Sequence, residues 1–275
     1  MTTDRKRRAV VLLNLGGPGS PEEVRPFLKS LFSDRDIFRF PLSGLTQPIF
    51  ASLVSACRSP SVRRNYGLIG GGSPILARTR EQARLLEEAL GDVKVFVAMR
   101  YSSPSIADMV EEVRNAAIDD AFLLPLYPHY SLTTTGSSFR EWDRRSAGLT
   151  CRVERVDRFY RNETYLRAIE ERIREGLACF PAGGEVHILF SAHGLPMSVV
   201  KRGDPYEGEI RETVELLKKG LGGSFPASLA YQSYIHALDY ARQRPQGRLP
   251  GNKNPAAPQI RIIEHADVRR MLLQQ

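Results

Sequence analysis

One histidine of this chain, His193, combines a reactive side chain with a setting that suits chemistry. It lies in the sequence Leu-Phe-Ser-Ala-His-Gly-Leu-Pro of residues 189–196, just past a short apolar run that predicts a strand. The small and turn-forming residues beside it would leave the imidazole open to a cleft. A loop histidine after a strand end is a usual place for metal or proton chemistry in an α/β protein. Among the other histidines, His187 lies at a predicted strand and is expected to be structural, whereas His129 fits a site as well as a core.

A second candidate for binding is the hydroxyl-rich stretch of residues 125–138, which ends where a helix is predicted to start. Such a loop can hydrogen-bond carboxylates and can line a flat aromatic ligand with Tyr127 and Tyr130. An ordinary Ser/Thr-rich turn has the same composition. The spacing alone therefore leaves both interpretations open.

Two glycine-rich turns, residues 16–20 and 66–74, precede predicted helices. The first could suggest dinucleotide binding at a helix amino end, but the third glycine of that fingerprint and the lysine of a P-loop are both missing. A tight turn is the better interpretation, although its backbone N–H groups could still help to hold an anionic group. The second turn indicates a place where the backbone must approach something closely.

The elements that must position these residues alternate between strands and helices. Strands are predicted at residues 10–15, a continuous apolar run, and at residues 93–99, 121–126, 151–156, 186–190 and 228–231. Helices are predicted after a capping box at residues 20–23, from Ser73 to about Leu90, after Ser103, and at residues 136–147, 162–177 and 205–221. The first helix is expected to pack one apolar face on the sheet. This alternation predicts an α/β protein with doubly wound parallel sheets, which bind ligands beyond the carboxyl ends of their strands.

The composition, with 42% hydrophobic and 25% charged residues in 275, is that of an ordinary globular protein. The net charge of +8 suggests an anionic partner, but no aromatic and basic motif for nucleic acid occurs, so no nucleic-acid partner is expected. Three cysteines without close spacing argue against disulfides, a zinc site and an iron–sulfur cluster, and they fit a reducing compartment. No signal peptide or transmembrane helix is predicted.

Taken together, these segments resemble the ferrochelatases. The matching stretches occur in the family's order and are residues 12–18, 69–74, 100–101, 125–138, 189–196, 203–206 and 230–233. The pair Ser-Ala-His-Gly-Leu-Pro and Gly-Asp-Pro-Tyr is highly specific. The resemblance implies two Rossmann-like domains with a porphyrin cleft between them. It further implies a lyase-type metal chelatase of heme biosynthesis that inserts ferrous iron into protoporphyrin IX or coproporphyrin III. Iron would be a substrate, and no permanently bound cofactor is implied.

The resemblance also assigns roles to individual residues. His193 matches the family's invariant active-site histidine. A neutral imidazole can accept a pyrrole proton or coordinate ferrous iron, and the residues alone do not decide between base and ligand. The porphyrin propionates need cations and hydrogen-bond donors. The candidates for that role are Tyr66, Ser73, Arg100, Tyr101, Tyr130 and Ser137.

Residues 41–57 are mostly apolar and have two interpretations. One is an ordinary amphipathic core helix. The other is the family's lip over the cleft, which would touch a membrane surface or guide an apolar substrate. The protein is expected in the cytoplasm, with peripheral membrane contact through these residues under the second interpretation.

The resemblance ends after about Ser233. We expect an N-terminal domain at residues 1–150, a partial second domain at 151–233 and a divergent, poorly ordered tail at 234–275. The family continues with a His-plus-Glu motif whose glutamate faces the histidine, and no matching motif follows Ser233 here. The simplest hypothesis is a family member whose coding frame or end was altered at this point. Its rivals are an inactive porphyrin-binding remnant, a chelatase for another metal or tetrapyrrole and, disfavoured by the glycine spacing, an α/β nucleotide-binding protein.

Overall fold

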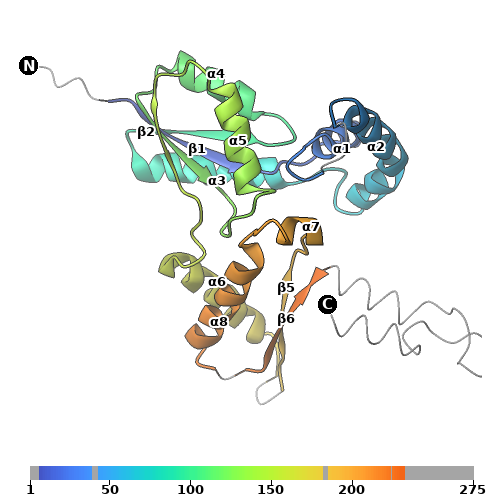
Figure 1. The fold of residues 1–275 in the computed structure, drawn as a ribbon. Helices are drawn as coiled ribbons and strands as arrows, with labels where there is room; N and C mark the ends of the chain where they lie inside the picture. The colour runs from blue at the N-terminus through green and yellow to red at the C-terminus, as the bar shows by residue number, and fades with distance from the viewer. Residues whose placement is uncertain (1–5, 39–42, 182–184, 224, 233–275) are drawn as a thin grey trace, which may run out of the picture. The chain divides into compact units, whose positions relative to one another are not determined.

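The computed structural model of the protein describes residues 6–38, 43–181, 185–223 and 225–232 (Figure 1). The chain divides into two compact units, Met1–Tyr160 with Arg202–Tyr206, and Arg161–Lys201 with Glu207–Gln275. The elements of the first unit are β1 (Arg8–Asn14), α1 (Val24–Phe32), α2 (Ser43–Gly67), α3 (Ile75–Leu90), β2 (Val93–Met99), α4 (Ile106–Asn115), β3 (Asp120–Pro125), α5 (Thr135–Arg145) and β4 (Arg152–Arg155). The elements that follow are α6 (Glu163–Leu177), β5 (Ile188–Ala192), α7 (Met197–Val200), α8 (Tyr206–Gly220) and β6 (Ala227–Tyr231). The predicted α/β class is confirmed.

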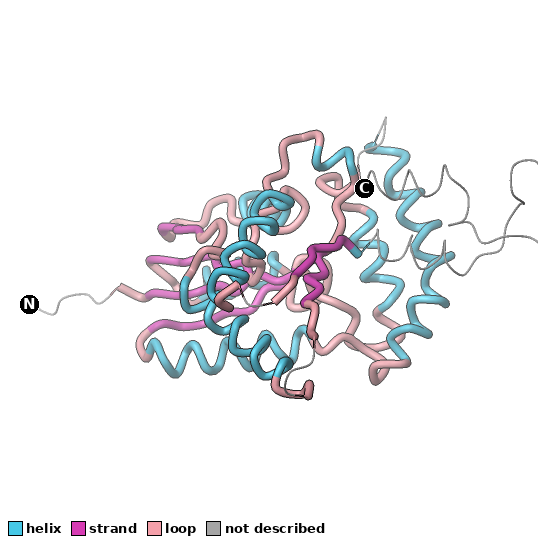
Figure 2. The backbone as a smooth tube through the Cα atoms, turned by 90° about the horizontal axis from the view of Figure 1, so that it is seen from below, coloured by secondary structure: helices cyan, strands magenta, loops and turns pink. Residues whose placement is uncertain are grey.

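The first unit is built on a parallel sheet with the strand order β2-β1-β3-β4, whose strands run side by side in Figure 2. β1 lies inside the sheet because its run of small and branched apolar residues can be buried on both faces. The register pairs Asn14 with Met99 and Leu13 with Pro125. The carboxyl ends of these strands therefore meet at one edge, and the loops that follow β2 and β3 carry Arg100, Tyr101 and Tyr130, half of the predicted substrate-binding residues.

Helices cover both faces of this sheet. On one face, alternate residues of β1, among them Val11 and Leu13, pack with Met109 and Val110 of α4 and Trp142 of α5. On the other face, residues that include Leu12 and Val97 pack with α3. Figure 1 shows α4 and α5 on one side of the strands and α3 on the other. The doubly wound arrangement follows from the period-two alternation of side chains along each buried strand.

The first helix packs differently from the prediction. Its apolar stripe, Val24, Leu28 and Phe32, is buried against α2 around Ala51, and not on the sheet. Phe32 and Phe50 meet edge to face with ring centroids 6.1 Å apart. An amphipathic stripe predicts that a face is buried, but it carries no information about which element buries it.

The start of α1 also corrects a prediction. The expected capping box at residues 20–23 does not form, because the Glu23 carboxylate accepts a hydrogen bond from the Gly19 N–H and the helix begins only at Val24. A capping box forms instead at the start of α4, where Ser105 and Asp108 exchange hydrogen bonds. Polar side chains near a helix start can hydrogen-bond to different backbone groups, and the conformation of the turn before the helix decides to which group each one bonds.

The strand β4 belongs to the first unit. It pairs in parallel with β3, and the unit extends to Tyr160, past the predicted domain boundary near residue 150. In the second unit, β5 and β6 form a parallel pair with Ala192 opposite Tyr231. The side chain of Asn162 caps α6 by accepting a hydrogen bond from the Tyr165 N–H.

Candidate active site

His193 directly follows β5 and is exposed. Because Ala192 lies opposite Tyr231 in the parallel register, the next residues, His193 and Gln232, leave the two strands together. The His193 Nδ1 lies 3.1 Å from the amide oxygen of Gln232. An amide oxygen can only accept, so Nδ1 donates; in the neutral imidazole this arrangement places the proton on Nδ1 and the lone pair on Nε2. The neighbouring strand thus sets the tautomer and the orientation of the imidazole.

Three predicted substrate-binding residues, Arg100, Tyr101 and Ser137, meet around the carboxylate of Asp34. Asp34 Oδ2 accepts hydrogen bonds from Ser137 Oγ at 2.6 Å and from the Tyr101 hydroxyl, and it forms an ion pair with Arg100 Nη2 at 2.8 Å. Arg100 Nε also donates to Ser137 Oγ at 2.9 Å. Asp34 follows α1, Arg100 and Tyr101 follow β2, and Ser137 begins α5, so the cluster joins three elements that are distant in sequence.

The charge state of this cluster follows from its surroundings. Burial by itself would raise the pKa of Asp34, but the hydrogen bonds from Ser137 and Tyr101 and the charge of Arg100 outweigh burial and lower it. Burial, and next the charge of Asp34, raise the pKa of Tyr101. At neutral pH the cluster therefore combines an ionised carboxylate, a neutral phenol and a guanidinium ion. Arg100 lines two surface cavities, of about 350 and 500 Å³.

Ser73 is placed by the close approach of the two glycine turns. Its N–H donates to the Pro18 carbonyl at 2.7 Å. A Cβ on Gly72 would lie 2.3 Å from the Gly19 carbonyl oxygen, and a Cβ on Gly17 would lie 2.7 Å from Ser73 Oγ. Only glycine permits this backbone contact. The prediction that the turn at residues 66–74 serves a close approach is confirmed, and its partner is the other glycine turn.

Tyr66 and Tyr130 lie elsewhere in the first unit, and both are half-buried. Tyr66 packs against the apolar cluster of α1 and α2, its carbonyl accepts a hydrogen bond from the Gly71 N–H at 2.8 Å, and partial burial raises its pKa. The guanidinium of Arg158 lies over the Tyr130 ring, 5.1 Å from its centroid. Tyr66 is therefore held in the last turn of α2, and Tyr130 lies in the loop between β3 and α5.

The hydroxyl-rich loop turns most of its side chains inward. Its buried hydroxyls are Ser131, Thr133, Thr135, Ser137 and Ser138. Ser131 Oγ donates to Asp204 Oδ2 at 2.8 Å, and Ser137 Oγ donates to Asp34. The loop thus does bind carboxylates, as one interpretation of its composition predicted, but those seen here are the protein's own.

The segment 41–57 buries one apolar face, as expected for a core helix, and leaves other apolar side chains exposed. Its role as a lip over a cleft stays a prediction. Its described part is the beginning of α2, where Ala51 is fully buried and Val54 packs beside it. Ile49 is 70% exposed and Leu53 64% exposed. Residues four apart share a helix face, so these two side chains form an exposed apolar pair. No helix in the described parts of the chain has the length and apolar character of a membrane span.

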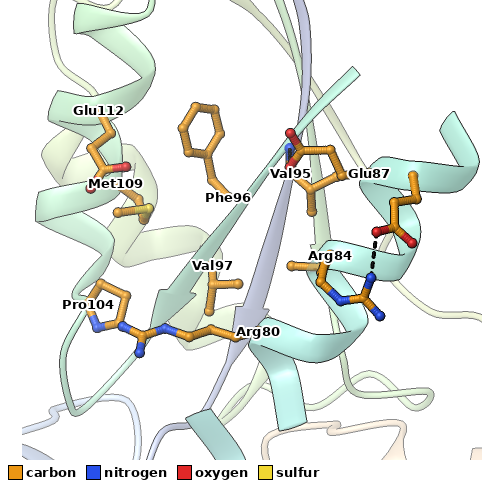
Figure 3. Close-up of a pocket in the computed structure, with 11 residues that line it drawn as sticks. Arg80, Arg84, Glu87, Val95, Phe96, Val97, Pro104, Met109 and Glu112 are labelled. Carbon is orange, nitrogen blue, oxygen red and sulfur yellow. Dashed lines mark hydrogen bonds and ion pairs between the residues drawn. The ribbon is translucent and has the colours of Figure 1, made fainter. Parts of the chain in front are cut away.

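A larger cavity, of about 640 Å³, lies along β2, one of the two edge strands of the first sheet. Figure 3 shows Arg80 and Arg84 of α3 on one side of it and Met109 and Glu112 of α4 on the other. None of the predicted site residues lines this cavity. Among the residues that the structure describes, no group of three or more His, Cys, Asp and Glu side chains is arranged to hold a metal ion.

Comparison with known proteins decides the family. The family model described as Ferrochelatase matches residues 7–238. This chain belongs to the ferrochelatase family. It is 44% identical to a ferrochelatase of Gloeobacter violaceus, over 85% of this chain and 74% of that protein. It is 46% identical to one of Geobacter metallireducens, over 83% and 72%, and 42% identical to one of Aquifex aeolicus, over 83% and 73%.

The ferrochelatase match covers parts of both units and ends at residue 238, close to Ser233, where the resemblance was predicted to end. Residues 233–275 lie outside the described part, so the predicted character of the tail stays a prediction. His193 belongs to the second unit, whereas the six predicted substrate-binding residues belong to the first.

Three residues that contact the candidate site residues or their loops had no predicted role: Gln232, Asp34 and Asp204. A signal existed for Gln232, because two parallel strands that end together place their next residues side by side. Asp204 was noted only as part of a turn. Asp34 carries no local signal, since its partners come from β2 and α5.

Proposed function

We propose that this chain is a working ferrochelatase that inserts ferrous iron into a porphyrin, protoporphyrin IX or coproporphyrin III, in heme biosynthesis. Family membership supports the reaction class, a lyase-type metal chelatase. The observation that carries the proposal for this chain is the hydrogen bond from His193 Nδ1 to Gln232, which leaves Nε2 as the basic nitrogen of an exposed ring.

The chemistry demands what such an imidazole supplies. Insertion exchanges one ferrous ion for both pyrrole protons of the porphyrin, and the ion must lose water before it reaches the ring nitrogens. A neutral histidine can take up a pyrrole proton at Nε2 and pass it to solvent, or it can hold the iron during dehydration. We assign His193 to this centre as the catalytic and metal-contacting residue. Ferrous iron is the substrate.

We assign Tyr66, Ser73, Arg100, Tyr101, Tyr130 and Ser137 to porphyrin binding. The support is chemical, because the propionates are anionic, Arg100 offers a cation, and Tyr66, Ser73 and Tyr130 carry hydroxyl groups. The hydroxyls of Tyr101 and Ser137 donate to Asp34, so these two residues would act by holding Arg100 in place. The Asp34 cluster restrains Arg100, so a carboxylate that approaches it would meet a pre-oriented guanidinium. Arg100 lines both cavities near this cluster, which further supports a binding role for it.

We also propose a cytoplasmic enzyme that touches a membrane through α2. The support is the exposed pair Ile49 and Leu53. Sedimentation with anionic vesicles tests this contact: replacement of both residues by serine should release the protein, whereas Leu85→Ser on α3, another exposed leucine, should not.

Anaerobic insertion of ferrous iron, or of zinc as a surrogate, into a dicarboxylate porphyrin tests the main proposal by absorbance. His193→Ala should abolish turnover while porphyrin binding, followed by fluorescence quenching, persists. The matched control is His187→Ala, which removes an exposed imidazole bonded to Ser228 at the start of the same strand pair.

Turnover in the wild type and in His187→Ala, lost in His193→Ala, is the expected result. A folded wild-type chain that binds porphyrin without inserting metal would refute the proposal and identify a binding remnant. Faster insertion of another metal than of iron would identify a different chelatase.

A further inference from the structure

Residues 202–206, which we call the anchor segment, belong to the first unit, although the chain on both sides of them belongs to the second. They include the Gly-Asp-Pro-Tyr sequence and are separated from His193 by a short stretch that contains α7. The chain thus leaves the first unit after Tyr160, returns for the anchor segment, and leaves again after Tyr206.

Asp204 holds the anchor segment in place. Its Oδ2 accepts hydrogen bonds from Ser131 Oγ at 2.8 Å and from the Leu132 N–H at 2.7 Å, and its Oδ1 accepts one from the Tyr206 N–H at 3.0 Å. Asp204 and Ser131 are both buried. Charge-assisted hydrogen bonds of this kind, shielded from water, are stronger than neutral ones.

A second set of contacts fixes the residue at the start of the segment. Arg202 Nη2 donates to the Asp36 carbonyl at 3.1 Å, and the Asp36 carboxylate pairs with Arg140 Nε at 2.9 Å. Arg140 Nη2 also donates to the Leu132 carbonyl at 2.6 Å. The backbone of Leu132 is therefore held at its N–H by Asp204 and at its carbonyl by Arg140.

The end of the segment is held by an aromatic cluster. The Tyr206 ring meets the His129 ring edge to face, with centroids 5.9 Å apart. The Tyr160 ring stacks on the same His129 ring, with centroids 5.5 Å apart. His129 thus contacts both Tyr160 and Tyr206, the residues after which the chain leaves the first unit.

We infer that Asp204 is a positioning residue for metal insertion: by fixing the anchor segment through Ser131 and Leu132, it restricts the loop that carries His193. This inference rests on the proposed function of His193. A catalytic group must be held closely to react, and misplacement by about 1 Å can cost about a hundredfold in rate. Asp204 itself touches neither iron nor porphyrin in this scheme.

Asp204→Asn is the sharpest perturbation. The variant keeps the shape of the side chain but has one acceptor oxygen, whereas two backbone donors, the Leu132 and Tyr206 N–H groups, need one each. One of them must then face an NH₂ group. Asp157→Asn is the matched control, because Asp157 is an exposed aspartate of the same unit.

The experiment measures metal insertion, porphyrin affinity and hydrogen exchange in the wild type, Asp204→Asn, Ser131→Ala, the double variant and Asp157→Asn. We expect Asp204→Asn to lower kcat by about tenfold to a hundredfold with the porphyrin dissociation constant unchanged. Exchange should accelerate at residues 193–203, and the double variant should be no slower than Asp204→Asn alone, because both changes break one contact. Asp157→Asn should behave as the wild type.

A merely structural role would lower kcat and porphyrin binding together, in proportion to the folded fraction, and this result would overturn the inference. So would an unchanged kcat in Asp204→Asn. If the wild type binds porphyrin but inserts no metal, the proposed function fails on that result. The anchor is then judged on exchange: acceleration at residues 193–203 in Asp204→Asn alone supports it, and unchanged exchange overturns it.

Discussion

Replacement of Asp34 by asparagine should destabilise the first unit strongly. The carboxylate is 6% exposed and receives Arg100, Tyr101 and Ser137 on one oxygen and the Asp36 N–H on the other. Asparagine keeps the shape and one acceptor but leaves the buried guanidinium without its charge partner. Removal of one partner of a buried ion pair costs about 3–5 kcal/mol.

The lower end of that range applies here. A second carboxylate oxygen, Glu141 Oε2, lies 4.0 Å from Arg100 Nη2 and would partly replace the lost charge. We therefore expect a loss of about 3 kcal/mol. In a domain of about 150–250 residues each kcal/mol lowers Tm by about 2–4 °C, so Tm should fall by about 6–12 °C. Thermal unfolding followed by circular dichroism at neutral pH measures this shift.

Asp143→Asn is the control, because the Asp143 side chain is half-exposed and pairs with Arg155 at the surface. Exposed pairs contribute about 0–1 kcal/mol. The pKa of Asp34 is lowered in the folded state, so its stabilisation is present above its ordinary pKa of 3.8 and is lost as the pH falls further. The gap between the wild type and Asp34→Asn should therefore narrow in acid. A Tm shift no larger than that of Asp143→Asn would refute the assignment of the cluster.

Three further predictions follow from single contacts. His129→Phe should flatten the pH dependence of stability, because burial lowers the pKa of His129 from 6.5 to about 4, and between these values protonation of the unfolded chain opposes folding. Thermal melts of the wild type and the variant across this pH range measure the dependence, and equal slopes in both proteins would contradict the prediction. Gly72→Ala should cost about 1–3 kcal/mol in denaturant unfolding, whereas Gly67→Ala, whose Cβ meets nothing within 4 Å, should cost nothing; equal effects would exclude the glycine contact as the cause. Gln232→Ala should lower kcat by about tenfold to a hundredfold without weakening porphyrin binding, because His193 loses the partner that orients it; an unchanged kcat would rule out that role.

The fold of the first unit was predictable where local signals agree with long-range packing. Continuous apolar runs such as β1 predict strands buried on both faces, and glycine or proline at the helix ends limits what lies between them. The packing partner of α1 could not be predicted in this way. Its apolar stripe indicates a buried face, but nothing in the stripe distinguishes α2 from the sheet as the element that buries it. The sequence of β4 likewise does not say which strand it pairs with, and its pairing with β3 comes from the structure.

The candidate site divides in the same way. His193 could be predicted because one short stretch contains both the reactive group and the strand end that presents it. Arg100, Tyr101 and Ser137 could be chosen by residue type, but their joint attachment to Asp34 could not. That cluster depends on the ends of α1 and β2 and the start of α5 converging, and no pattern within any of these elements encodes it.

The two motifs that identify the family therefore differ in physical role. The loop around His193 presents a group whose partner, Gln232, arrives from the adjacent strand. The Gly-Asp-Pro-Tyr sequence presents Asp204 to the protein's own loop, where the carboxylate is buried and accepts three hydrogen bonds from protein groups. The first sequence is restricted by the chemistry of the His193 ring. The second is restricted by the need to hold the chain that leads to His193. A specific motif is thus strong grounds for assigning a family, but the contacts of each side chain are needed to separate a reacting residue from a residue that positions it.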